Sequence, residues 1–186
     1  MSDEAATVGS AAGVDEPEAE ATGEGRGGDV SPTPPGAGRM TAAADRLGLA
    51  VEVVERPAAE NLDEAAALLG LDSSSVVKSL VVKRHDGSFL FALVPGDRQI
   101  SWSKLRAVVG VNKLSMPSAD VALDATGYER GTITPLGSRT AWPVFADERM
   151  VGRRVALGAG AHGRSALVDA DSLLASLSAT VADISD

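Results

Sequence analysis

Residues 76–83 read Val-Val-Lys-Ser-Leu-Val-Val-Lys. Valine and leucine dominate this stretch, which is typical of a largely buried β-strand. Asp86-Gly87 follows, a pair that favours a tight hairpin turn, and residues 89–94 supply a second apolar run. The sequence therefore predicts two neighbouring strands joined by a hairpin.

Helical and strand patterns alternate before this hairpin. An apolar helical face runs over residues 40–47, and a short strand is expected at 51–54. Asn61 and Glu64 resemble a capping box for a helix over residues 62–69.

The same alternation continues after the hairpin. Helices are expected at 101–109, 118–126 and 171–177, and strands at 111–114, 142–146, 153–157 and 165–168. Interspersed helices and strands with at least one hairpin favour an α/β fold, with a compact mixed sheet and surrounding helices, over a purely parallel sheet.

The composition limits the classes of protein and of site. A chain of 186 residues with 44% hydrophobic residues can bury one ordinary core. The sequence has no Cys and two His, which argues against disulfides, a cysteine nucleophile and a structural zinc site. No metal and no organic cofactor is expected. Aromatic residues make up only 3%, which argues against a module that stacks nucleic-acid bases on aromatic faces.

Residues 1–39 differ from the rest of the chain. They are rich in Gly, Pro, Ala and acid, with almost no large apolar side chain, so we expect a disordered extension. The folded domain is then expected at 40–180, with a short tail at 181–186. The N-terminus carries no secretory signal and no run is long enough to cross a bilayer, so a cytoplasmic protein without a membrane partner is expected.

The net charge of -9 conceals an uneven distribution. Residues 1–40 hold eight Asp or Glu against two Arg, whereas residues 78–164 hold thirteen Lys or Arg against seven Asp or Glu. The second segment could present a basic surface to phosphates, or its charges could simply solvate the surface.

Lys78 lies on an apolar face of its predicted strand. Alternation places it with Val76, Leu80 and Val82, where a lysine is costly to bury without a partner. One interpretation is a lysine that extends to solvent near a strand end. The other is a cation in a pocket that binds a phosphate, a carboxylate or a polarised carbonyl.

Two glycine-rich loops are further candidates. Residues 127–137 read Gly-Tyr-Glu-Arg-Gly-Thr-Ile-Thr-Pro-Leu-Gly, in which backbone N–H groups could be fixed towards a ligand, although ordinary turns have the same composition. Residues 158–163 read Gly-Ala-Gly-Ala-His-Gly and lack the following helix of a nucleotide-binding motif. His162 could therefore be a proton donor, a phosphate contact or a turn residue.

No convincing catalytic triad can be assembled. The sequence has no Gly-x-Ser-x-Gly elbow and no Cys. If the protein is an enzyme, positioning and backbone electrostatics should contribute more than a side-chain nucleophile.

These motifs occur together in an order that resembles the YbaK/EbsC family, which includes freestanding relatives of the prolyl-tRNA synthetase editing domain. The resemblance rests on residues 65–71, 76–82, 127–137 and 158–163. It implies a compact mixed α/β fold and a trans-editing hydrolase that cleaves the ester between a wrong amino acid and the terminal adenosine of tRNA. It also implies that water or a group on the substrate makes the attack.

The resemblance also implies roles for individual residues. Lys78, Gly131 and Thr134 would be catalytic, with Lys78 at the acceptor end and the loop amides near the ester carbonyl. The residues expected to bind substrate are Tyr128, Thr132, Ile133, Pro135, Gly137, Gly160 and His162. Thr134 stands where relatives often have Ser, and Ala161-His162 where many have basic residues. The expected partners are the acceptor end of a mischarged tRNA and prolyl-tRNA synthetase.

Two other functions stay open. The same pocket could belong to a non-catalytic module that binds tRNA or an aminoacyl analogue. The protein could also be an interaction module whose acidic extension recruits a partner.

Overall fold

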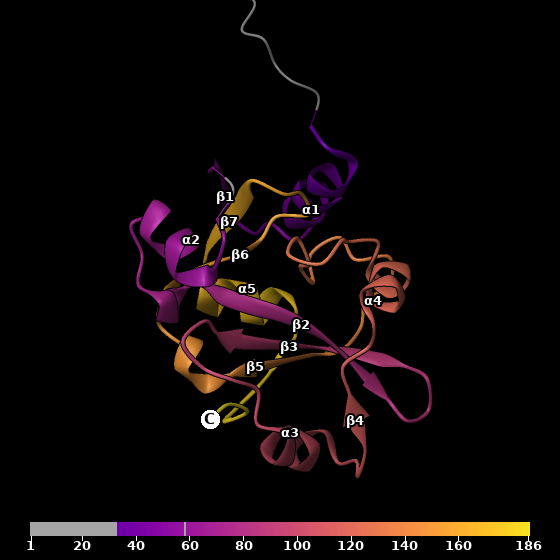
Figure 1. The fold of residues 1–186 in the computed structure, drawn as a ribbon. Coiled ribbons are helices and arrows are strands. Elements are labelled where there is room, and N and C mark those ends of the chain that lie inside the picture. Colours follow the sequence, from indigo (N-terminus) through magenta and orange to yellow (C-terminus); the bar gives the residue numbers. More distant parts are fainter. Residues whose placement is uncertain (1–32, 58) are drawn as a thin grey trace, which may run out of the picture. The chain divides into compact units, whose positions relative to one another are not determined.

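The structure is a computed structural model and describes residues 33–57 and 59–186 (Figure 1). Residues 1–32 of the extension that we expected at residues 1–39 lie outside the described residues. Helix α1 spans Pro35–Arg46, so it begins before the domain boundary that we expected at residue 40. Proline at the first helical position has a φ angle suited to a helix and lacks only an N–H that would have no intrahelical partner.

Two β-sheets form the framework, where the sequence suggested one. The smaller sheet has the order β1-β7-β6, with β1 at Val51–Glu55, β6 at Arg154–Gly158 and β7 at Arg164–Asp169, all antiparallel. The larger sheet has the order β4-β2-β3-β5-β8. Its strands are β2 at Val77–Arg84, β3 at Phe89–Pro95, β4 at Leu114–Ser115, β5 at Val144–Asp147 and β8 at Thr180–Ala182.

The predicted hairpin is present as β2 and β3, which pair antiparallel in one continuous register from Val77↔Pro95 to Lys83↔Phe89. Strand β3 pairs parallel with β5, and β5 pairs parallel with β8, so the larger sheet is mixed as expected. The two sheets meet at an isolated parallel bridge between Val76 and Ala156. Beyond this bridge one edge of β2 has no partner strand within the described residues until Lys83, and this edge borders a cavity.

Four further helices complete the described part of the chain: α2 at Leu62–Leu68, α3 at Trp102–Val109, α4 at Ala119–Thr126 and α5 at Ala170–Ser176. Short 3-10 turns lie at Ser73–Ser75 and Glu148–Met150. The predicted N-cap of α2 is confirmed, because the Asn61 side chain accepts from the Glu64 N–H at 2.9 Å. The capping box is not complete, because the Glu64 side chain accepts from the N–H of Glu60, the residue before the cap, and not from that of Asn61. Ser118 caps α4, whereas the Ser101 side chain makes no capping bond to α3.

Two apolar clusters lie on opposite faces of the larger sheet. Alternation along β2 sends Val77 and Val81 into the larger cluster, together with side chains of the smaller sheet, α1 and α5. Val82 packs into the second cluster with Leu105 of α3 and Ile184. Because Ile184 and Ser185 are both fully buried, residues 181–186 belong to the folded domain and are not the short tail that we expected.

Candidate functional site

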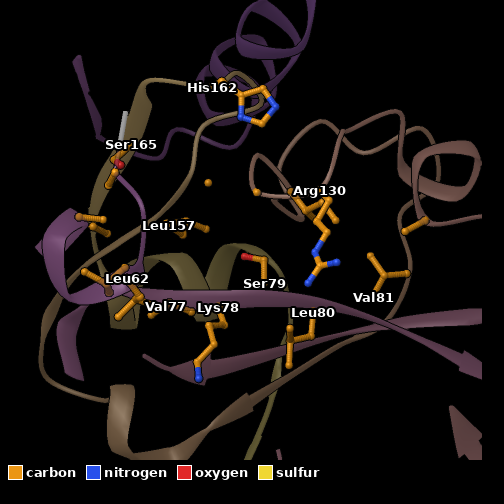
Figure 2. A pocket seen from close by; sticks show the side chains of 18 of the residues that line it. Leu62, Val77, Lys78, Ser79, Leu80, Val81, Arg130, Leu157, His162 and Ser165 are labelled. Carbon is orange, nitrogen blue, oxygen red and sulfur yellow. The ribbon is translucent and has the colours of Figure 1, made fainter. Parts of the chain in front are cut away.

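A cavity of about 750 Å³ lies along β2 on the side away from β3 (Figure 2). Strand β2 pairs with β4 only at Lys83 and Arg84, so most of this edge has no partner strand within the described residues. Residues 76–81 form one wall of the cavity. The remaining walls come from α2 and the residues before it, from residues 116–122, from the loop at 130–133, and from the ends of β6 and β7.

The charged residues that line the cavity are basic. They are Arg56, Lys78, Arg130 and Arg164, and no Asp or Glu occurs among the lining residues that the structure describes. Arg164 forms an ion pair of 2.6 Å with Glu55, a residue that does not line the cavity, and Arg56 donates a hydrogen bond to Ser165 Oγ at 3.0 Å. Arg130 forms no ion pair with any described residue. Such a cavity suits an anionic ligand.

Lys78 and Ser79 leave β2 on opposite faces. Ser79 points towards the loop that carries Arg130, and Lys78 points away from it (Figure 2). Lys78 Nζ donates a hydrogen bond to the main-chain carbonyl of Arg98. Burial lowers the pKa of Lys78 below its ordinary value, and the nearby carboxylate of Asp97 raises it in part.

The predicted loop at 127–137 reaches the cavity with two of its predicted residues, Gly131 and Ile133. Gly131 has a φ of +88°, a conformation that favours glycine. The loop lies directly on the end of β6, because a side chain at Gly158 would come within 2.3 Å of the Ile133 carbonyl oxygen. Glycine at position 158 therefore permits the contact that holds the loop at the cavity.

Three other predicted residues of this loop are buried and bonded within the protein. The Tyr128 hydroxyl donates to the Leu136 carbonyl at 2.7 Å, and Thr132 Oγ1 donates to the Glu129 carbonyl at 2.9 Å. Thr134 Oγ1 accepts from the Leu136 N–H at 3.3 Å. None of the three belongs to the cavity lining. Their bonds brace the loop from within.

Pro135, Gly137 and Gly160 also lie outside the lining. A side chain at Gly137 would come within 2.4 Å of the Arg39 carbonyl oxygen, and one at Gly160 within 2.5 Å of the Gly36 carbonyl oxygen. Both glycines therefore let the loops pack against α1. The sequence predicted close backbone approach at these positions, but the partner is a helix and not a ligand.

His162 lines the mouth of the cavity. Its side chain is 67% exposed, and Nε2 lies 3.0 Å from Glu129 Oε2. The structure thus brings Lys78, Gly131, Ile133 and His162 to one cavity.

Comparison with known proteins identifies the domain. A family model described as "Aminoacyl-tRNA editing domain" matches residues 56–175, which is more than half of the chain. The chain belongs to the aminoacyl-tRNA editing domain family. Every predicted site residue, from Lys78 to His162, lies inside the matched range.

Curated relatives of this editing domain include proline-tRNA ligases. The chain is 36% identical over 94 residues to the enzyme of Thermosipho africanus and 36% identical over 98 residues to that of Trichlorobacter lovleyi. The aligned segments cover 50% and 53% of this chain but only 17% of each ligase. The similarity therefore concerns one region of these larger enzymes.

Solved structures share the fold. A structure described as a candidate trans-editing enzyme for prolyl tRNA synthetase superposes with a TM-score of 0.77 and 29% identity, over 83% of this chain and 99% of that one. The hypothetical protein APE2540 superposes with a TM-score of 0.75 at 24% identity, over 80% of this chain and 99% of that one. These matches confirm the expected mixed α/β editing-domain fold.

Arg130 and Ser79 are among the cavity residues that were not singled out from the sequence. Arg130 lies inside the predicted loop but was not distinguished from a solvated surface charge. Ser79 lies two residues from both Val77 and Val81, so strand periodicity alone could have placed its hydroxyl on the same face of β2 as these two valines.

Within residues 33–57 and 59–186 no group of three or more His, Cys, Asp or Glu is placed to hold a metal ion. The helices of the same region include none that is long and apolar enough to cross a membrane.

Proposed function

We propose that this protein is a trans-editing hydrolase that removes wrongly attached amino acids from tRNA. The observation that carries the proposal is the cavity of the editing domain, whose charged lining residues are all cations. Its volume of about 750 Å³ is in the usual range for pockets that bind small molecules and cofactors. The acceptor end of a tRNA carries phosphates, a terminal nucleoside and an aminoacyl ester. The phosphates would supply the negative charge that no side chain of the described lining supplies.

The cations around the cavity would bind the acceptor end. Arg130 has no carboxylate partner among the described residues, so its guanidinium can form a bidentate contact with a phosphate at little cost. Lys78 would contribute a second positive charge from the other face of β2. These contacts would hold the ester in a fixed position, which by itself accelerates hydrolysis.

Water, or a group on the substrate itself, would attack the ester carbonyl carbon. We assign the amide of Gly131 to the developing oxyanion, because Gly131 lines the cavity, whereas the next amide, that of Thr132, already donates to the Glu129 carbonyl at 3.0 Å. Thr134 and Tyr128, together with Thr132, Pro135, Gly137 and Gly160, would act by holding this loop in place. Ile133 and His162 would contact the substrate.

The relation to proline-tRNA ligases makes tRNA(Pro) the first substrate to test, and prolyl-tRNA synthetase the first partner. The purified protein is incubated with misacylated tRNAs, beginning with Ala-tRNA(Pro) and Cys-tRNA(Pro), and loss of the aminoacyl ester is followed. Lys78→Ala should abolish most of the hydrolysis that the parent protein shows. Lys83→Ala is the matched control, because Lys83 lies on the same strand but is exposed and outside the cavity lining. Binding without turnover across the panel would instead favour a non-catalytic module.

A further inference from the structure

Ser79 lines the cavity, and its hydroxyl bonds to nothing in the described part of the protein. Its Oγ is buried and has no hydrogen-bond partner among the described residues. The other cavity serines differ, since Ser165 Oγ accepts from Arg56 Nε at 3.0 Å and Ser118 Oγ accepts from the Val121 N–H at 3.4 Å. A buried hydroxyl without a partner destabilises the free protein, so a ligand that bonds to it would remove that cost.

The backbone of Ser79 faces the same space. Arg84 donates its N–H to Ser88 across the hairpin at 2.8 Å, so the even-numbered residues of β2 direct their N–H and C=O groups towards β3. The odd-numbered residues, Ser79 among them, direct theirs towards the opposite edge. That edge borders the cavity and has no partner strand at Ser79 among the described residues.

The charge of the cavity selects the kind of ligand atom. The hydroxyl proton of Ser79 needs an acceptor, and no carboxylate lines the described part of the cavity. The nearby charged residues are cations, which favour an oxygen atom that gains negative charge and disfavour an ammonium group. In Figure 2 Ser79 points to the same side of β2 as the loop that carries Arg130.

We propose that the Ser79 hydroxyl donates a hydrogen bond to the carbonyl oxygen of the scissile ester as that oxygen becomes an oxyanion. This inference rests on the proposed hydrolase function. In the step itself, a water oxygen bonds to the carbonyl carbon and the carbonyl π electrons move onto the oxygen held by Ser79. The carbonyl then re-forms, the bond to the ribose oxygen breaks, and a proton from the water ends on that ribose oxygen. In this proposal the Ser79 hydroxyl and the Gly131 amide, both from residues that line the cavity, are the two donors to the oxyanion.

The test compares Ser79→Ala with the parent protein under single-turnover conditions on the best misacylated tRNA of the panel. The maximal rate should fall about a hundred- to a thousandfold, because one donor to the transition-state charge is lost. Affinity for the non-hydrolysable analogue 3′-(alanylamino)-3′-deoxyadenosine should fall far less than the rate, because the carbonyl of the analogue carries no full charge. Ser79→Thr keeps the hydroxyl and should retain most of the rate.

Ser138→Ala is the control. Ser138 Oγ is also buried without a described partner, but Ser138 does not line the cavity. Both alanine variants should be at least as stable as the parent protein in thermal unfolding, and only Ser79→Ala should be slow. A parent-like rate for Ser79→Ala, or a loss confined to affinity for the analogue, would overturn the assignment of Ser79 alone. A parent protein that hydrolyses no member of the panel would remove the proposed function and this inference together.

Discussion

Lys78 and Arg98 are joined by a hydrogen bond from the lysine Nζ to the arginine main-chain carbonyl, on the face of β2 that Ser79 does not use. The loop that carries this carbonyl is held by the C-terminal residues. Gln99 and Asp186 exchange two main-chain hydrogen bonds of 3.2 and 2.9 Å, and Arg98 Nε donates to Ser185 Oγ at 2.9 Å. The position of Lys78 thus depends on Ser185 and Asp186.

The charge of Lys78 should respond to Asp97. Burial lowers the pKa of Lys78 and Asp97 raises it, so Asp97→Asn should lower this pKa further. A lysine with a lowered pKa loses its positive charge at a lower pH, so substrate contacts that need the cation would weaken earlier as the pH rises. NMR titration of the Lys78 amine checks the shift. Asp86→Asn, at the hairpin turn, should leave the titration unchanged.

Asp147 should stabilise the packing of Ile184 and Ser185 against the domain. Its buried carboxylate accepts from Ser185 Oγ at 2.7 Å, from the Ile184 N–H at 3.2 Å and from Arg149. Burial alone would raise its pKa, but these hydrogen bonds hold the pKa below the ordinary value of 3.8. Asp147→Asn should lower the free energy of unfolding at pH 7 by roughly 2–4 kcal/mol, as denaturant titration would measure.

The pH dependence of the same variant follows from the sign of the shift. A depressed folded-state pKa stabilises the fold above the unfolded value of 3.8, and the stabilisation is lost as pH falls through the folded pKa. Stability of Asp147→Asn should therefore fall less steeply below about pH 4 than that of the parent protein. Glu148→Gln alters an exposed neighbour and should follow the parent. Parallel acid curves for Asp147→Asn and the parent would contradict this assignment.

Arg130 should contribute to binding through phosphate contact. Arg130→Ala should weaken the binding of a non-acylated tRNA(Pro) acceptor-stem RNA. It should also reduce the slope of log affinity against log salt concentration by about 0.7, the value for one phosphate contact to a single strand. Arg154→Ala is the comparison, because Arg154 is exposed, pairs with Glu52 and lies outside the cavity lining. Equal slopes for Arg130→Ala and the parent protein would exclude a phosphate contact by Arg130.

Tyr128 should matter for stability more than for substrate binding. Its hydroxyl donates to the Leu136 carbonyl and the Arg39 guanidinium lies 4.8 Å from the ring centroid, so Tyr128→Phe keeps the ring contact and leaves one buried carbonyl unpaired. The expected cost is about 1–3 kcal/mol in the free energy of unfolding. KM for the misacylated tRNA should stay within twofold at a temperature where the variant is folded. A raised KM without a loss of stability would instead place the hydroxyl at the substrate.

The sequence predicted elements better than it predicted their assembly. The β2–β3 hairpin followed from local signals, the two apolar strands and the Asp86-Gly87 turn, and the start of helix α2 followed from Asn61. The split into two sheets depends on pairings between distant segments, such as β1 with β7 and β5 with β8, which no local pattern encodes. Strand β8 is three residues long and was missed for the same reason.

The candidate site was predicted in part. Lys78, Gly131, Ile133 and His162 do line one cavity. Glycine and proline in a loop indicate that backbone approaches something closely, but they do not say what, and at Gly137 and Gly160 the neighbour is helix α1. Tyr128 and Thr134 turned inwards because their polar groups bond to backbone inside the loop. Ser79 was overlooked although strand periodicity places its hydroxyl on the face of Val77 and Val81, because the sequence does not show that the neighbouring edge of β2 lacks a partner strand.

The most direct test of the account is the rate at which the purified protein releases the amino acid from Ala-tRNA(Pro) and Cys-tRNA(Pro), measured beside Lys78→Ala and Lys83→Ala. The account predicts hydrolysis of at least one substrate by the parent protein and by Lys83→Ala, and its near loss in Lys78→Ala. Hydrolysis by Lys78→Ala at the parent rate, with the variant confirmed as folded, would contradict it.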